Sequence, residues 1–220
     1  MKTHWALFTL LGYAALAMAA GDGSARLTLT DDHGLQVRAE IQVFAGSEQP
    51  SWSGTTDEQG VVTFNPEPGQ TLRIHPVDTG RYYACSLVWG PGPRQVTLLD
   101  KTLAANLEAN ADMFVEQGAF AKAALVLNEL CARFGSIDAE KAKDYEIRTY
   151  QALANHFEIV HATYFDPLQD QVVMSAVLAD KVRHAQEALE LPPTGRVDYR
   201  FLSKVAGEQV HRFLFWRQAP

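Results

Sequence analysis

The hydrophobic pattern of the chain changes its period near Asp100, and this change constrains the fold more than any other feature. Before Asp100, apolar and polar residues alternate in short runs separated by turns rich in Gly, Pro and Asp. A period of two is typical of strands with one buried face. After Asp100, apolar residues recur about every 3.6 residues, which indicates amphipathic helices. The sequence therefore predicts an α+β protein with two domains, strands over residues 25–99 and helices over residues 100–220.

The stretch from Ser53 to Ile74 predicts three short strands joined by two turns. Asp57 and Gly60 take the first and fourth places of a turn, where Asp bonds to its own backbone and Gly adopts a positive φ. In the second turn Pro68 fixes φ and Gly69 permits the reversal. Similar patterns elsewhere predict an antiparallel β-sandwich of about seven strands. The expected strands are Arg26 to Thr30, Leu35 to Phe44, Ser51 to Thr56, Val61 to Phe64, Thr71 to His75, Arg81 to Trp89 and Arg94 to Leu99.

Three segments of this region resemble one superfamily of β-sandwiches. They are the alternating run from Val37 to Phe44, the turn and strand from Thr56 to Phe64, and Pro68-Gly69 before Leu72-x-Ile74. The pattern is similar to that of the carboxypeptidase-regulatory, transthyretin-like domains. The resemblance implies the fold and a non-catalytic role, because such domains are appended to peptidases, transporters and surface proteins as non-catalytic units.

Two catalytic relatives of this fold carry signatures that the chain lacks. A hydroxyisourate hydrolase ends its sandwich in Tyr-Arg-Gly-Ser, whereas this region ends in Val96-Thr-Leu-Leu-Asp100. An intradiol dioxygenase binds iron through paired Tyr and His residues. Tyr82, Tyr83 and His75 are candidates, but the chain has no His-x-His, and adjacent tyrosines on a strand point to opposite faces. We expect these tyrosines to have structural roles.

The first 19 residues predict a cleaved signal peptide. Lys2 supplies the only charge, an apolar run follows from Trp5 to Ala17, and Ala17-Met18-Ala19 is a small-x-small end. The alternative is an N-terminal membrane anchor, although the run is shorter than the ~20 residues that span a bilayer. Cleavage leaves 18 Lys and Arg against 26 Asp and Glu, a charge of −8. We therefore expect a periplasmic or secreted protein without a membrane span, which does not bind nucleic acid.

Two cysteines, Cys85 and Cys131, remain after the signal peptide. In an oxidising compartment a pair of cysteines commonly forms a disulfide. Such a bond would join the strand region to the second helix and stabilise the fold by about 4 kcal/mol. The alternative is two buried, reduced thiols, and the sequence leaves both open.

The helical region predicts a bundle of about five helices. Gln117-Gly118-x-Phe120-x-x-Ala123-x-x-x-Leu127 resembles the middle of one tetratricopeptide-type hairpin, although a solenoid needs about three repeats. The alternative is ordinary packing of two antiparallel helices. The expected helices run from Asp100 to Gln117, Phe120 to Phe134, Asp138 to Phe165, Leu168 to Leu191 and Val197 to Trp216.

Two Glu-x-x-His motifs are the clearest chemical signal, because two such motifs and two further acids form the ligand set of ferritin-like di-iron bundles. These residues are Glu158 and His161, Glu208 and His211, and Glu129 and Glu187. Helical periodicity places Glu208 and His211 opposite the apolar face of the last helix, so we expect them to face water. Asp180 and His184 share a helix face, where they form either a weak surface metal site or a solvated pair.

The apolar residues near the C-terminus, Phe213, Phe215 and Trp216, point in different directions around one predicted helix. They either pack against the strand region or form a patch for a partner. We expect a non-catalytic binding or accessory module that needs no cofactor and presents a surface to another envelope protein. An enzyme or metal protein built on the helices, and a structural component of an envelope assembly, are the alternatives.

Overall fold

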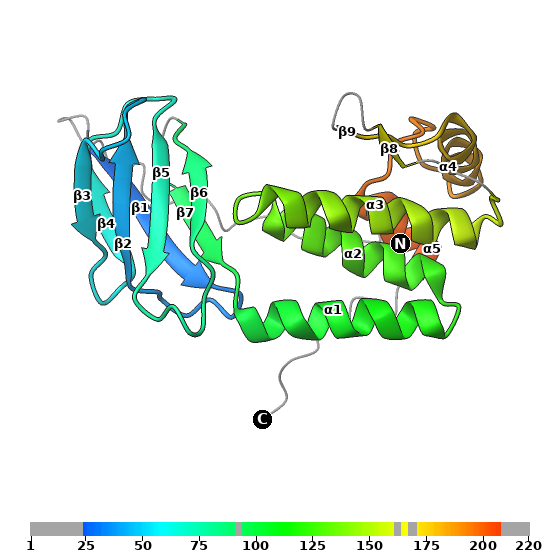
Figure 1. Ribbon diagram of the computed structural model, residues 1–220, viewed down its shortest axis with the longest axis horizontal. Coiled ribbons are helices and arrows are strands. Elements are labelled where there is room, and N and C mark those ends of the chain that lie inside the picture. Colours follow the sequence, from blue (N-terminus) through cyan, green and yellow to red (C-terminus); the bar gives the residue numbers. More distant parts are fainter. Residues whose placement is uncertain (1–23, 91–93, 161–163, 167–170, 208–220) are drawn as a thin grey trace, which may run out of the picture.

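The computed structural model describes residues 24–90, 94–160, 164–166 and 171–207 (Figure 1). Two sheets lie at one end of this part of the molecule, and helices form the other end (Figure 1). The described residues contain five helices, all of which follow the two sheets in the chain. This arrangement confirms the α+β class. The predicted signal peptide, residues 1–19, lies outside the described residues.

The two sheets contain the seven strands that precede the helices. The first sheet has the order β4-β1-β7 and the second has the order β3-β2-β5-β6. Their bounds are β1 (Ala25–Asp31), β2 (Ala39–Phe44), β3 (Trp52–Thr55), β4 (Val61–Phe64), β5 (Thr71–Pro76), β6 (Cys85–Val88) and β7 (Arg94–Leu98).

The prediction of a wholly antiparallel arrangement is wrong for one pair of strands. β7 runs parallel to β1, with Leu27 opposite Arg94 and Asp31 opposite Leu98. The chain leaves the second sheet after β6 and enters the first as β7, so no hairpin joins β1 and β7. A long connection permits parallel pairing, whereas a tight turn enforces the antiparallel form.

Two predicted strands are shorter than expected because the chain changes partners within them. Gln36 forms an isolated bridge with Thr30 of β1, and the pairing with β3 and β5 starts only at Ala39. Similarly, Tyr82 bridges to Asp100, and pairing with β5 begins at Cys85. The hydrophobic alternation around Val37 and the apolar run from Tyr82 to Cys85 both continue through these transitions, so the sequence does not reveal them.

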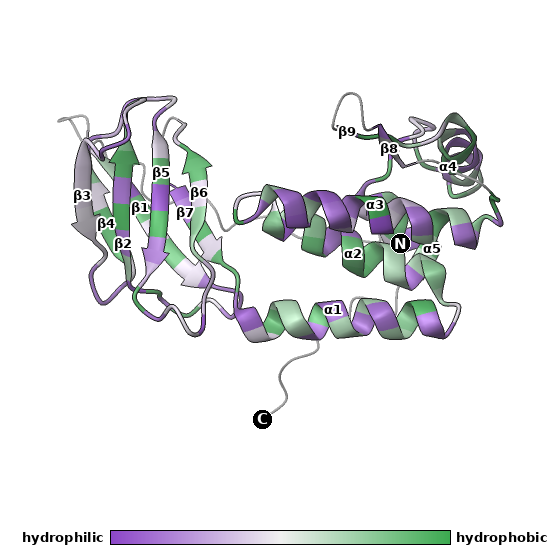
Figure 2. Cartoon of the chain, viewed as in Figure 1, coloured by the Kyte–Doolittle hydropathy of each residue, from purple (hydrophilic) through white to green (hydrophobic). Residues whose placement is uncertain are grey.

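The two sheets enclose one hydrophobic core. Hydrophilic and hydrophobic residues alternate along β2 and β5 (Figure 2). Leu27, Ile41 and Ile74 are fully buried in this core. Trp52 of β3 stacks on Phe64 of β4, with 5.1 Å between ring centroids, and so joins the edges of the two sheets.

The turn predicted at Asp57 and Gly60 is confirmed. The Asp57 Oδ1 accepts hydrogen bonds from the backbone N–H groups of Gln59 and Val61, at 2.9 and 2.8 Å. Gly60 has a φ of 69°. A Cβ atom at this position would lie 2.4 Å from the Leu29 carbonyl oxygen, so both backbone conformation and space require Gly here.

The helices begin within two residues of their predicted starts in four cases and end earlier than expected in three. Asp100 and Asp138 cap the first and third helices through their carboxylates. The first two predicted helices are confirmed. The bounds are α1 (Lys101–Glu116), α2 (Phe120–Phe134), α3 (Ala139–His156), α4 (Ala176–Ala188) and α5 (Tyr199–Ala206).

The long third helix predicted to reach Phe165 is wrong, because α3 ends at His156. Glu158 has a φ of 56°, and the Ile159 N–H donates to the Ala154 carbonyl at 2.8 Å. This pattern is a Schellman motif, which usually places Gly at the left-handed residue. The short hairpin of β8 (Phe165–Asp166) and β9 (Gln171–Val172) follows.

The fourth and fifth helices also differ from the prediction. α4 begins after Ser175, whose side chain caps it, and ends in a second Schellman motif with Glu190 at a φ of 56°. α5 ends before Gly207, whose φ of 84° and ψ of 148° are not helical. The remainder of the last predicted helix, residues 208–216, lies outside the described residues.

The helices share a second hydrophobic core, in which α2 is the central element. The first three helices run alternately in opposite directions, with α2 between α1 and α3 (Figure 1). Leu125, Leu130 and Phe134 of α2 are fully buried among them. Among the described residues, no helix combines the length and apolar character needed to cross a membrane.

Candidate functional site

A network of charged side chains occupies the junction between the sheets and the helices. Asp31, at the end of β1, is fully buried, and its Oδ2 accepts hydrogen bonds from Arg81 Nη2 at 3.0 Å and from the Tyr82 hydroxyl at 3.1 Å. Arg81 Nε donates to Asp100 Oδ2 at 3.1 Å. Asp100 also caps α1, so Arg81 links the end of a strand to the start of a helix.

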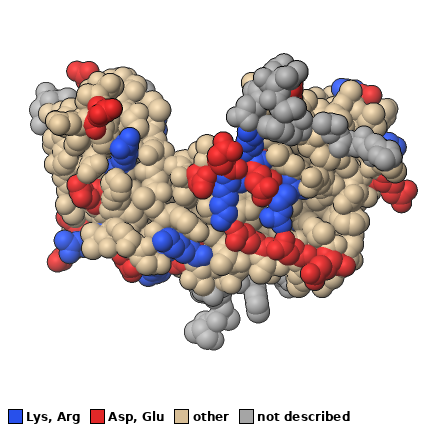
Figure 3. Space-filling model, in the orientation of Figure 1, with Lys and Arg blue, Asp and Glu red and all other residues tan. Residues whose placement is uncertain are grey.

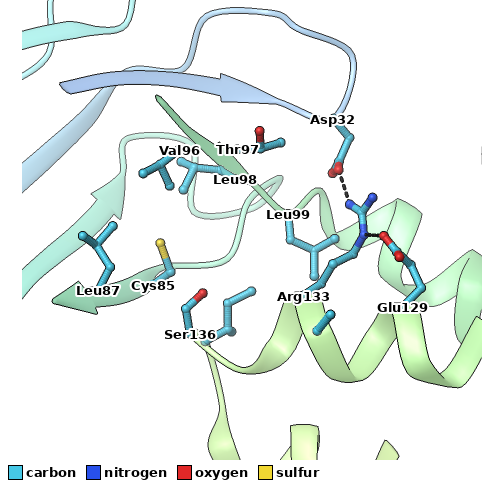
Figure 4. Close-up of a pocket in the computed structure, with 12 residues that line it drawn as sticks. Asp32, Cys85, Leu87, Val96, Thr97, Leu98, Leu99, Glu129, Arg133 and Ser136 are labelled. Atoms are coloured by element: carbon cyan, nitrogen blue, oxygen red, sulfur yellow. Dashed lines mark hydrogen bonds and ion pairs between the residues drawn. The ribbon is translucent and has the colours of Figure 1, made fainter. Parts of the chain in front are cut away.

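The next residue, Asp32, extends the network to the far end of α2. Its Oδ1 pairs with Arg133 Nη1, and its Oδ2 accepts from the backbone N–H of Asp100 at 3.4 Å. Arg133 Nε donates to Glu129 Oε1 at 2.6 Å within the same helix. Figure 4 shows Arg133 reaching from α2 to Asp32, with Glu129 beside it. One guanidinium therefore bridges two carboxylates from different parts of the fold.

The network shifts the pKa values of its members. Burial opposes ionisation of Asp100, but hydrogen bonds from Arg81 and from the backbone of Thr102 and Leu103 outweigh it, so the pKa of Asp100 lies below its ordinary value. Burial, followed by the hydrogen bond to Asp31, raises the pKa of Tyr82 to about 12. At neutral pH the carboxylate is charged and the phenol is protonated, and each state favours the observed bonds.

Apolar and backbone contacts also cross the junction. Tyr82 is buried in the core of the sheets, whereas its neighbour Tyr83 packs against Phe134 of α2, with 5.2 Å between ring centroids. The backbone N–H of Ser86 in β6 donates to the Ser136 carbonyl at 2.8 Å. The outer edge of β6 is therefore partly paired with the segment that follows α2, which protects an otherwise open sheet edge.

A cleft of about 340 Å³ lies beside this network (Figure 4). Its walls come from β6, β7, the end of α2 and the segment after it. Burial raises the pKa of the Cys85 thiol at this cleft to about 11, so the thiol is protonated at neutral pH and is a poor nucleophile. The lining residues are Asp32, Cys85, Leu87, Val96, Thr97, Leu98, Leu99, Glu129, Ala132, Arg133, Ser136 and Ile137.

A second hollow, of about 380 Å³, is a groove between α1 and α3 that we call the helical groove. Leu127 of α2 and Ala152 of α3 are buried residues that line it, and Val115 of α1 is 41% exposed beside them. Polar side chains of α1 and α3 complete the lining. The full set is Asp112, Val115, Glu116, Leu127, Arg148, Gln151, Ala152 and Asn155.

The described members of the predicted di-iron set are not brought together. Glu129 is paired with Arg133 at the junction, Glu158 lies beyond the opposite end of α3, and Glu187 is exposed on α4. His161, Glu208 and His211 lie outside the described residues. Within the part of the chain that the structure describes, no three His, Cys, Asp or Glu residues are grouped closely enough to hold a metal ion.

Asp180 and His184, considered as either a weak surface metal site or a solvated pair, make separate contacts. The Asp180 carboxylate pairs with Arg183, and His184 Nδ1 lies 2.9 Å from the Asp180 backbone carbonyl oxygen instead. The iron ligands considered for a dioxygenase also separate, because Tyr82 and Tyr83 face different cores and His75 is exposed on β5.

Cys85 and Cys131 are both free thiols and both half-buried. Burial raises the pKa of Cys131, and the nearby Glu146 carboxylate raises it further. The candidate partner patch at Phe213, Phe215 and Trp216 lies outside the described residues.

Sequence reasoning missed Arg81, Arg133 and Asp32, which organise the junction. The only available signal was the acidic pair Asp31-Asp32 at the end of a predicted strand. No local pattern indicates that an arginine far along the chain returns to it.

No protein-family model matches this chain, and no curated protein sequence matches it.

Proposed function

We propose that this chain is an exported, non-catalytic binding module that presents its helical groove to another envelope protein. The observation that carries this proposal is the form of the groove, which has buried apolar residues at its base, a partly exposed valine and a polar rim. An apolar centre with a polar rim is typical of protein-binding surfaces. Export is supported by the leader sequence, and the compartment we propose is the periplasm or the extracellular space.

We infer that the two sheets form a transthyretin-like β-sandwich of the carboxypeptidase-regulatory type and that the helices form a bundle attached to it. The single core shared by both sheets and the Asp57–Gly60 turn support this assignment. The domains of this type carry or position other units, which fits a strand region that holds a helical region through a fixed joint.

The chemistry of the junction supports a structural role for it. Arg81 and Arg133 each pair with two carboxylates of the network, and the Cys85 thiol is protonated at neutral pH. Ion pairs that join different segments in this way hold two parts of a protein in a fixed orientation. We therefore place partner binding in the helical groove and assign the junction to positioning that groove.

Capture experiments with a matched pair of variants test this function. The purified protein is immobilised and incubated with an envelope extract, and bound proteins are identified by mass spectrometry. Val115→Arg places a charge in the groove, whereas Val177→Arg changes a valine of α4 that does not line the groove and is 57% exposed. We expect one partner to be captured by the unaltered protein and by Val177→Arg, and to be lost with Val115→Arg.

Equal capture by both variants would refute the groove as the binding surface. Turnover of a substrate by the purified protein would refute the non-catalytic assignment. Circular dichroism of both variants verifies that the folds are intact, which is expected because both valines are exposed.

A further inference from the structure

Charged side chains on α1 and α3 form a ladder across the face of the helical region. Figure 3 shows a row of acidic side chains along α1 and basic side chains beside it on α3. The acids are spaced four residues apart, which places them on one side of α1. On α3 the facing positions are spaced seven residues apart, which is two helical turns. The acids are Glu108, Asp112 and Glu116; on α3 Lys141 pairs with Glu108, Arg148 pairs with Asp112, and Asn155 lines the helical groove together with Glu116.

The first two rungs of the ladder are closed ion pairs. Glu108 Oε1 lies 2.7 Å from Lys141 Nζ and also accepts a hydrogen bond from the Tyr145 hydroxyl. Asp112 Oδ1 lies 2.5 Å from Arg148 Nη2. Each acid of α1 is therefore matched by a cation of α3 at these positions.

The third rung lacks its cation. Glu116 is exposed and lines the helical groove, and the position that continues the basic series on α3 is Asn155, an amide. Within the described residues, Glu116 has no hydrogen-bond or ion-pair partner. The groove thus contains two carboxylates, Asp112 and Glu116, against one guanidinium, that of Arg148, so it carries one excess negative charge.

The position of Glu116 in its helix adds to this negative potential. It is the last residue of α1, where the partial charge of the helix end is negative, and the last turn contains no basic residue. A carboxylate is unfavourable at the C-terminal end of a helix, and a cation is favourable there. The Glu116 carboxylate therefore interacts unfavourably with the end of its own helix, and a cation bound beside it would offset that interaction.

The groove suits a cation that is attached to an apolar chain. Val115, which is 41% exposed, provides an apolar surface next to Glu116 above the buried Leu127 and Ala152, and Gln151 and Asn155 add side-chain amides to the same lining. Lys and Arg side chains pack their aliphatic stems on apolar surface while their charged ends remain with polar groups. A small, strongly hydrated metal ion would gain nothing from the apolar part of the groove.

We infer that the helical groove takes a Lys or Arg side chain from a segment of the partner protein, with Glu116 as its anchor. The inference rests on the proposed function, because it specifies the chemistry of the partner at the same groove. The incoming cation supplies the third rung of the ladder, and the stem of its side chain covers the exposed part of Val115.

Peptide binding to the full chain tests the inference. The probe is a fluorescein-labelled peptide, Ala-Leu-Lys-Ala-Leu-Lys-Ala, measured by fluorescence anisotropy at low salt. A second peptide carries norleucine in place of both lysines, which keeps the apolar stem and removes the charge. The protein variants are Glu116→Gln, which removes the anchor charge, and Asn155→Lys, which supplies the missing cation from α3. Glu187→Gln is the matched control, since it removes an exposed acid of α4.

We expect the lysine peptide to bind, and to lose about fivefold in affinity with either Glu116→Gln or Asn155→Lys, as one exposed ion pair contributes about 1 kcal/mol. Glu187→Gln is expected to leave the affinity unchanged. The norleucine peptide is expected to bind more weakly to the unaltered protein and to be insensitive to Glu116→Gln. Equal binding of the lysine peptide to the unaltered protein and to Glu116→Gln would overturn the inference.

The proposed function and this inference fail in different ways. If an envelope partner is lost with Val115→Arg and retained at full affinity by Glu116→Gln, the groove binds a partner but not through a basic side chain. If neither substitution changes the amount of partner that is captured, the groove itself is not the binding surface. A competition experiment with spermidine tests whether a free amine can replace the protein segment. If spermidine displaces the labelled peptide at equal concentration, a free amine is sufficient for binding, and the assignment to a protein segment is overturned.

Discussion

Asp32 and Arg133 lie 101 positions apart in the chain and form an ion pair that joins the end of β1 to the end of α2. The Asp32 side chain is 7% exposed and that of Arg133 is 23% exposed. Their partial burial distinguishes them from the exposed pairs of the α1–α3 ladder. Loss of this pair is therefore expected to affect stability more than loss of a pair in the ladder.

Removing Arg133, whose partner carboxylate is mostly buried, is expected to destabilise the protein more than removing Arg148, whose partner is exposed. Arg133→Leu leaves the mostly buried Asp32 carboxylate without its cation, and we expect a loss of about 2–3 kcal/mol in the free energy of unfolding. Arg148→Leu breaks the pair with Asp112, whose side chain is 63% exposed, and is expected to cost less than about 1 kcal/mol. Urea unfolding measures both. Equal losses would contradict a special role for the junction.

Gly60 is expected to be intolerant of any side chain. Gly60→Ala combines the strain of a positive φ with a Cβ atom 2.4 Å from the Leu29 carbonyl oxygen, so we expect a loss of about 3 kcal/mol or more. Gly69 is the matched control, because its φ is 90° but no atom lies within 4 Å of the added Cβ. Gly69→Ala is expected to cost about 1–2 kcal/mol. Thermal unfolding measures the stability of both variants, and the difference between them gives the cost of the steric clash apart from that of the backbone strain.

The charge of Asp100 is expected to stabilise the fold only above acidic pH. Its folded pKa is depressed, so its contribution is present above the unfolded value of about 3.9 and is lost as the pH falls through the folded pKa. Asp100→Asn keeps a good helix cap and removes the charge facing Arg81. We expect it to lower stability by about 0.5–1 kcal/mol at pH 7, because Arg81 is 41% exposed. Urea unfolding at pH 7 and pH 3 should show this difference shrinking in acid; a difference independent of pH would contradict the assignment.

Both thiols are expected to be free and slow to react in the folded protein. Cys85 has a pKa of about 11, so only about 0.1% of it is thiolate at pH 8. The pKa of Cys131 is also raised by burial. The denatured, unreduced protein should release two equivalents of chromophore from a thiol reagent at once, and the folded protein should react far more slowly. Zero free thiols after denaturation would instead indicate a disulfide between the two.

Metal analysis addresses the two Glu-x-x-His motifs directly. We expect the purified protein to contain neither iron nor zinc in stoichiometric amount, because Glu129 is held by Arg133 and Glu158 lies at the other end of α3. Elemental analysis by mass spectrometry measures this. Stoichiometric metal that is lost on His161→Ala or His211→Ala would establish a metal site and reverse the non-catalytic assignment.

Local chemistry in the sequence determined the strand region, the first two helices and their starts. Asp57 with Gly60, and the capping residues Asp100 and Asp138, act through hydrogen bonds to residues within four positions. Hydrophobic alternation likewise depends only on neighbours, so it identified β4 and β5 nearly to the residue. These features can be predicted from the sequence because the residues that form them lie close together in the chain.

Only the tertiary structure decided where α3 and α4 end, which strands pair in parallel and which charges meet. Glu158 and Glu190 take the left-handed position that Gly usually fills, because Ile159 and Leu191 then fold back onto the helical core. No Gly or Pro lies between the end of α3 and Pro167, and Pro192 marks the end of α4 only to within a few residues. Leu98 and Leu99 belong to different cores although they are adjacent, and Asp31 and Asp32 bind arginines from opposite sides of the junction. Such choices depend on burial and on charge pairs between distant segments, and both exist only once the sheets and helices have come together.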